Sequence, residues 1–163
     1  MVVKSCRAVP GGQLSATVPT FLFGNARFYL GVSPMSNEEL IHKFESDLIP
    51  EDSFHHADHV CLAFAYLSEY PPLQALDKFS RALQRYAAAR GKAQRYHETI
   101  THAYFFLIRE RMARSPGADW DEFSRRNADL LTWKDGILTR YYQEATLKSE
   151  LARTVFVFPD KCR

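Results

Sequence analysis

The sequence predicts an all-α protein, a single-domain helical bundle of about four main helices followed by short C-terminal helices. Apolar residues recur at steps of three and four, as one buried helix face requires. Helix-starting motifs recur along the chain, and proline or glycine interrupts the pattern after most periodic stretches. The strict alternation that indicates β-strands is almost absent, and the short connections are typical of a bundle.

Four main helices are expected over residues 36–49, 53–68, 72–90 and 94–113. The first begins at a capping box, Ser36–Glu39, in which the serine accepts a hydrogen bond from a backbone amide three residues later. The last of the four is the most apolar, so we expect it to lie at the centre of the bundle. Shorter helices are expected over residues 119–127 and 132–142, before a tail that lies extended over the bundle.

Residues 1–34 differ from the rest of the chain. They contain several prolines, a Pro10-Gly11-Gly12 break and no sustained apolar period, which predicts a poorly ordered N-terminal extension. A second interpretation is that the native protein begins at Met35, which directly precedes the first helix. The predicted organisation is therefore an extension over residues 1–34 and a helical bundle domain over residues 35–163.

Composition and charge limit the function classes. Of 163 residues, 46% are hydrophobic and 25% charged, which is typical of a soluble globular domain. A net charge of +2 gives no global reason to expect nucleic acid or membrane partners. Three cysteines at wide spacings do not form a disulfide framework, so we expect a cytoplasmic protein. The basic stretch over residues 81–95 is interpreted as a solvated helix face rather than a phosphate-contacting surface.

Five of the six histidines fall in two stretches, residues 54–60 and 96–102, each at the start of an expected helix. Residues three or four apart share a helix face, so His56 and His59 point in one direction. On the other helix, His97 shares its face with apolar residues and is predicted to point inward. His102 goes with Glu98 to an adjoining face, and the role of His55 is left open between a ligand and a cap.

A metal site is the first hypothesis for this cluster. If the two helices are neighbours, His56, His59 and His97 converge and can hold a divalent zinc, iron or manganese ion. Glu98 is the candidate catalytic residue, either as a further ligand or as a general base acting on metal-bound water. The function predicted in this way is a small-molecule metalloenzyme with hydrolytic or oxygen-dependent chemistry.

Two other interpretations stay open. The histidines could line a metal-free polar pocket, or they could simply satisfy hydrogen bonds with Tyr, Thr and Asp neighbours. The alternative function is then that of a non-catalytic helical module that binds a small ligand or a partner protein. Such a module could be a homodimer. The aromatic segments 133–136 and 140–142 could roof such a pocket, or Trp133 could pack into the core.

The stretches Phe54–Val60 and Tyr96–Thr101 resemble those of an uncharacterised bacterial family of small all-helical proteins, over about residues 36–160. This resemblance implies a bacterial, soluble, helical protein and no established activity. In ligand pattern the chain is also similar to DinB-like bundles, which hold a metal with three histidines. Those bundles pair two histidines four residues apart and late in the chain, whereas His56 and His59 are early and three apart.

Overall fold

Residues 35–161 are described by the structure, a computed structural model, and they form an all-α bundle with no strand among them. The seven α-helices of this part of the chain are α1 (Asn37–Glu45), α2 (His56–Glu69), α3 (Pro72–Ala89), α4 (Glu98–Arg114), α5 (Trp120–Arg126), α6 (Glu144–Leu147) and α7 (Glu150–Thr154). Short 3₁₀ turns connect them, namely η1 (Glu51–Ser53), η2 (Ala93–Arg95), η3 (Ala128–Leu130) and η4 (Ile137–Arg140). The predicted extension over residues 1–34 lies outside the described residues.

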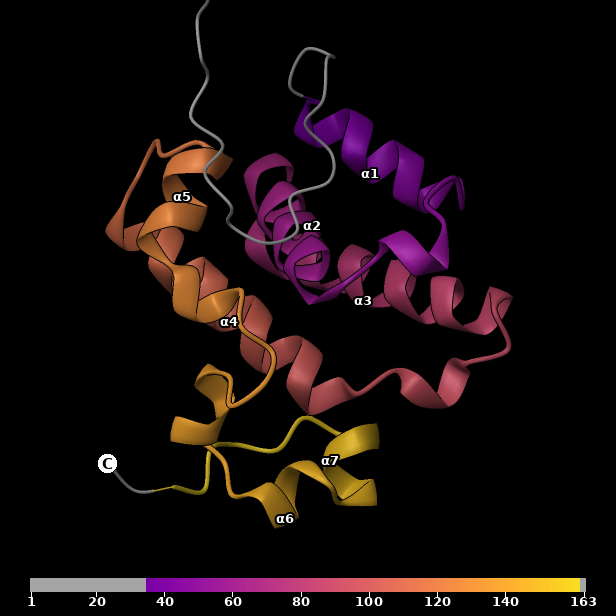
Figure 1. The fold of residues 1–163 in the computed structure, drawn as a ribbon, viewed down its shortest axis with the longest axis vertical. Coiled ribbons are helices and arrows are strands. Elements are labelled where there is room, and N and C mark those ends of the chain that lie inside the picture. The colour runs from indigo at the N-terminus through magenta and orange to yellow at the C-terminus, as the bar shows by residue number, and fades with distance from the viewer. Residues whose placement is uncertain (1–34, 162–163) are drawn as a thin grey trace, which may run out of the picture. The chain divides into compact units, whose positions relative to one another are not determined.

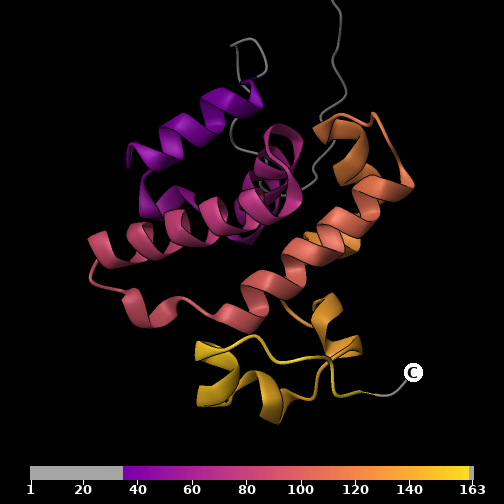
Figure 2. The ribbon, with the colours of Figure 1, turned by 180° about the vertical axis from the view of Figure 1, so that it is seen from behind.

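Helix α2 is the centre of the bundle (Figures 1 and 2). It packs against α1, α3 and α4, and α3 and α4 also contact each other. The short helix α7 and the turn η4 pack against α4. The neighbouring positions of α2 and α4 meet the first condition of the histidine hypothesis, which also requires the rings of His56, His59 and His97 to lie at the same height.

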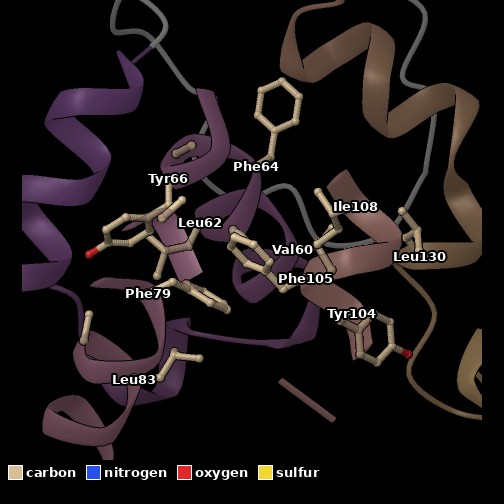
Figure 3. Close-up of a cluster of buried hydrophobic side chains, with 14 of the residues drawn as sticks. Val60, Leu62, Phe64, Tyr66, Phe79, Leu83, Tyr104, Phe105, Ile108 and Leu130 are labelled. Atoms are coloured by element: carbon tan, nitrogen blue, oxygen red, sulfur yellow. The ribbon is translucent and has the colours of Figure 1, made fainter. Parts of the chain in front are cut away.

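The core explains why α2, rather than α4 as predicted, is the central helix. Almost every residue of α2 from Val60 to Tyr66 is buried, whereas α4 leaves Phe106 43% exposed. Ala63 and Ala65 lie among these buried residues, and their small side chains let neighbouring helices approach α2 closely. Figure 3 shows large side chains from α2, α3 and α4 meeting in one cluster, namely Val60, Leu62, Phe79, Leu83, Phe105 and Ile108.

The predicted helix starts and ends are partly confirmed. Ser36 Oγ accepts from the Glu39 amide at 3.1 Å, and Asp119 caps α5 by accepting from the Glu122 amide at 2.8 Å. Gly91 follows α3 with a φ of 65°, a conformation that glycine adopts without strain. These local motifs fixed their helices because each satisfies backbone groups that the first or last turn leaves unpaired.

Three predicted boundaries and one predicted helix were wrong. Helix α1 ends at Glu45 rather than near residue 49. Helix α2 begins at His56 rather than near residue 53, and α4 begins at Glu98 rather than near residue 94, because η1 and η2 precede them. The expected helix over residues 132–142 is only the turn η4. A Cβ atom at Gly136 would lie 2.6 Å from the backbone oxygen of Thr132, so the chain doubles back too tightly there for a continuous helix.

The tail lies extended against α4, as predicted. The buried Thr99 hydroxyl donates to the Val155 carbonyl at 2.8 Å and accepts from the Val157 amide at 3.0 Å. The Tyr142 hydroxyl donates to the Val157 carbonyl at 2.9 Å. Side chains of the bundle thus make the hydrogen bonds that a neighbouring strand would otherwise make to the backbone of the tail. This explains how the tail stays extended without a sheet.

Candidate ligand-binding cavity

A cavity of about 530 Å³ lies among α2, α3 and α4. Each helix lines it with residues about one turn apart, so the cavity follows from the same periodicity that builds the core. The residues that these helices contribute include His56, His59 and Val60 from α2, Phe79, Leu83 and Tyr86 from α3, and Ile100, Thr101, Tyr104 and Phe105 from α4.

The lining changes from apolar to charged between the floor and the mouth. The floor is formed by fully buried apolar side chains, namely Val60, Ala63, Phe79, Phe105 and Ile108. The mouth is marked by the exposed residues His55, Arg95 and Trp133, of which Trp133 is 60% exposed. The exposed end of the cavity is therefore lined by Arg95 of η2 and by Trp133, and its inner end by apolar groups.

His59 is the most unusual residue of the wall. Its ring packs on Phe54, with 4.3 Å between the ring centroids, and neither ring nitrogen makes a hydrogen bond to a described residue. Burial, aided by the neighbouring His56, lowers the pKa of His59 to about 4. The imidazole is therefore neutral at pH 7, with one N–H donor and one lone pair on a wall that faces the cavity.

His56 lies one turn earlier on the same wall. Its Nε2 is 2.9 Å from the Leu130 carbonyl, which can only accept, so Nε2 carries the proton and Nδ1 keeps its lone pair. The ring lies between Tyr104 and Trp133, at 4.8 and 5.1 Å between centroids. Burial lowers the pKa of His56 as well. The aromatic roof anticipated from the sequence at residue 133 is therefore present, although Lys134 takes no part in the lining.

His97, the third predicted ligand, is tied to the backbone through both ring nitrogens. It is the N-cap of α4, where Nδ1 accepts from the Ile100 amide at 3.2 Å, and Nε2 donates to the Leu147 carbonyl at 2.9 Å. His97 lines the cavity, but in this conformation it offers no free lone pair. Residues 35–161 contain no group of three or more His, Cys, Asp or Glu side chains that could hold a metal ion.

Glu98, the predicted catalytic residue, does not line the cavity. Its carboxylate pairs with His102 Nε2 at 3.1 Å, on the adjoining face expected from the helical phase. The Ser80 hydroxyl lies 3.4 Å from the same Nε2 atom. Because serine and carboxylate meet one nitrogen, this cluster lacks the arrangement in which histidine bridges a nucleophile and an acid through its two nitrogens.

Two tyrosines add hydroxyl donors near the cavity. Burial raises the pKa of Tyr96 and of Tyr104 to about 12, so both stay protonated at neutral pH. The Tyr104 hydroxyl makes no hydrogen bond to a described residue. The Tyr96 hydroxyl is buried and also unpaired, although Ser80 and Glu98 lie close to it without reaching hydrogen-bond geometry. Tyr96 and Tyr104 both line the cavity, so each contributes a hydroxyl group to its wall.

The mouth carries basic groups that were predicted from the sequence to lie on a solvated helix face. Lys92 and Arg95 both contact the Glu51 carboxylate, Arg95 at 3.5 Å. The Lys92 ammonium holds the pKa of Glu51 below its usual range, so Glu51 is ionised. Arg90 stacks on Tyr86 at 3.5 Å and donates to backbone carbonyls, which makes it part of the wall. Only the i, i+4 spacing of Tyr86 and Arg90 could have indicated this contact.

Comparisons with known proteins do not assign a function, so the proposed function is based on the fold and the cavity. No protein-family model, curated protein or solved structure matched the chain. The resemblance stated from the two histidine stretches stays a prediction. None of the described helices is both long enough and apolar enough to cross a membrane.

Proposed function

We propose that this protein binds a small molecule in the cavity among α2, α3 and α4. The observation that carries the proposal is the His59 imidazole, which lies on the cavity wall without a hydrogen-bond partner among the described residues. The Tyr96 hydroxyl, which also lines the cavity, is buried and has no hydrogen-bond partner among the described residues. Leaving such a group unpaired costs about 1–3 kcal/mol, which a ligand hydrogen bond would recover. The cavity volume of about 530 Å³ lies within the range typical of small-molecule sites.

The wall chemistry favours binding over acid–base catalysis. An efficient general base has a pKa near the working pH, whereas the pKa of His59 is lowered to about 4. A neutral imidazole and the Tyr104 hydroxyl instead offer hydrogen bonds to an uncharged polar group. Phe79 and Phe105 surround the apolar remainder. The buried part of the ligand is therefore apolar or aromatic, with one uncharged hydrogen-bonding group.

A neutral fluorescent probe tests the proposal through a matched pair of variants. Phenylnaphthylamine is expected to bind the native protein, and Ala87→Phe to weaken its binding by about ten-fold or more because the new ring enters the cavity. Ala88→Phe adds the same ring at the adjacent, exposed position of α3, which does not line the cavity, and is expected to leave binding unchanged. The measurement is a fluorescence titration of both variants.

Two outcomes would contradict binding in the cavity. One is failure of the probe to bind the native protein at all. The other is equal weakening, or no weakening, in the Ala87→Phe and Ala88→Phe variants. Thermal unfolding of each variant, followed by circular dichroism, separates a blocked cavity from a protein that no longer folds.

Metal-dependent chemistry by His56, His59 and His97, with Glu98 as base, stays a prediction. To ligate a metal, His97 would have to release the Ile100 amide or the Leu147 carbonyl. Releasing the amide removes the cap of α4, and releasing the carbonyl breaks the hydrogen bond between His97 and α6. The prediction requires stoichiometric zinc, iron or manganese in protein purified without a histidine tag, together with a loss of stability after chelation. Elemental analysis measures the first and thermal unfolding the second.

A further inference from the structure

The charges at the cavity mouth identify the class of ligand. We infer that the ligand is an organic anion with an apolar body, whose acidic group lies beside Lys92 and Arg95 while its body extends to the cavity floor. This inference rests on the proposed function, because it assigns chemistry to the same cavity. It adds a second contact point, at the mouth, to the hydrogen bond expected at His59.

The mouth has more positive than negative charge. Among the described residues that line the cavity, Glu51 is the one acidic side chain, and it is shared between Lys92 and Arg95. The acidic groups nearby are engaged elsewhere. Asp47 pairs with Arg90, and Asp58 accepts a hydrogen bond from the His55 amide at 2.8 Å. One cationic charge at the mouth therefore lacks a carboxylate of its own.

Arg95 is the group best placed to receive a ligand anion. Its only hydrogen bond within residues 35–161 is the long contact of one amino group with Glu51, at 3.5 Å, and its side chain is 68% exposed. The remaining guanidinium N–H groups are free to donate, and guanidinium binds carboxylate, sulfonate and phosphate through paired donors. Arg90, by contrast, is held by carbonyl groups and by the Tyr86 ring, so it fixes the wall.

The lining of the cavity floor excludes the reverse orientation of the ligand, in which its acidic group would be buried at the floor. The floor contains no charged side chain among the described residues, and both wall histidines have lowered pKa values, so a buried carboxylate would find no cation there. At the mouth the same carboxylate stays partly hydrated next to Arg95. An anionic group therefore lies at the mouth and an apolar ring at the floor.

Two probes with the same ring system separate the charge from the cavity. Anilinonaphthalene sulfonate carries an acidic group on the skeleton of phenylnaphthylamine. Only the affinity of the sulfonate therefore depends on the charges at the mouth. Arg95→Gln is expected to weaken sulfonate binding by about three-fold at low salt, and Glu51→Gln to strengthen it by about three-fold. Lys92→Gln is expected to act in the same direction as Arg95→Gln. Neutral-probe affinity is expected to stay constant in all three variants.

The control is Arg109→Gln, which removes the same charge from an exposed position of α4 away from the cavity. Equal effects of Arg95→Gln and Arg109→Gln on the sulfonate, or weaker sulfonate binding in Glu51→Gln, overturn the anion assignment while the neutral probe still binds. Failure of the neutral probe to bind the native protein, or neutral-probe binding that Ala87→Phe does not weaken, overturns the proposed function instead. Higher salt is expected to shrink the Arg95 effect, since ions screen exposed charges.

Discussion

Phe105→Ala is expected to lower the free energy of unfolding by about 3–5 kcal/mol, the largest single effect predicted for this chain. Phe105 is completely buried, contacts Phe79 at 5.8 Å between ring centroids, and forms part of the cavity floor. Truncation removes ring contacts with α3, and the gap it leaves merges with the existing cavity. Chemical denaturation followed by circular dichroism measures the change.

The neighbouring residue provides the matched control. Phe106 has the same side chain and packs edge-on against Phe105, at 6.0 Å between centroids, but it is 43% exposed. Phe106→Ala is therefore expected to cost only about 1 kcal/mol, since most surface substitutions change stability little. Similar losses in the two variants would show that burial at residue 105 is not what stabilises the packing of α3 and α4.

Local motifs account for the parts of the fold that the sequence predicted well. The Ser36 and Asp119 caps and the Gly91 stop each satisfy backbone groups within a few residues, so they act wherever the helix is placed. The neighbouring positions of α2 and α4 were a condition of the hypothesis rather than a prediction. Periodicity shows which face of a helix is buried, whereas the element that covers that face depends on the whole fold.

The candidate site shows the same division between local and long-range information. Helical phase placed His56 and His59 on one wall of the cavity. It could not show that His97 would cap α4 and bond to the Leu147 carbonyl, 50 residues later. The acceptor of His56, the Leu130 carbonyl, is 74 residues away. Because backbone carbonyls occur at every residue, no sequence pattern marks the ones that will meet a histidine.

The mouth was missed for a related reason. Lys92 lies between two predicted helices and has no helical phase, and Arg95 was assigned to the predicted helix over residues 94–113, whereas α4 begins only at Glu98. Their place at the cavity depends on η2 turning the chain back toward η1, where Glu51 lies. A basic stretch read alone is most often a solvated surface, and only the contact with Glu51 distinguishes this one.

Stability should fall steeply as the pH decreases from neutral, and His59 is expected to account for a large share of that fall. Its pKa is lowered from 6.5 to about 4 in the folded protein, so between these values the unfolded chain binds a proton that the folded chain does not. Unfolding is therefore favoured progressively as the pH falls through this window. With 1.36 kcal/mol for each unit of pKa, the loss is on the order of 3 kcal/mol. Above the window His59 is neutral in both states and contributes nothing.

Replacing His59 with glutamine isolates this contribution. His59→Gln is expected to lose about 3 kcal/mol less than the native protein between about pH 7 and pH 4, whatever its stability at neutral pH. Taking the difference cancels the titration of buried groups that do not interact with His59, such as Asp58, whose pKa is raised by burial. His42→Gln, at an exposed position of α1, is expected to keep the native dependence. If His59→Gln also kept it, the imidazole would be hydrated in the folded protein, and the main observation behind the cavity proposal would be lost.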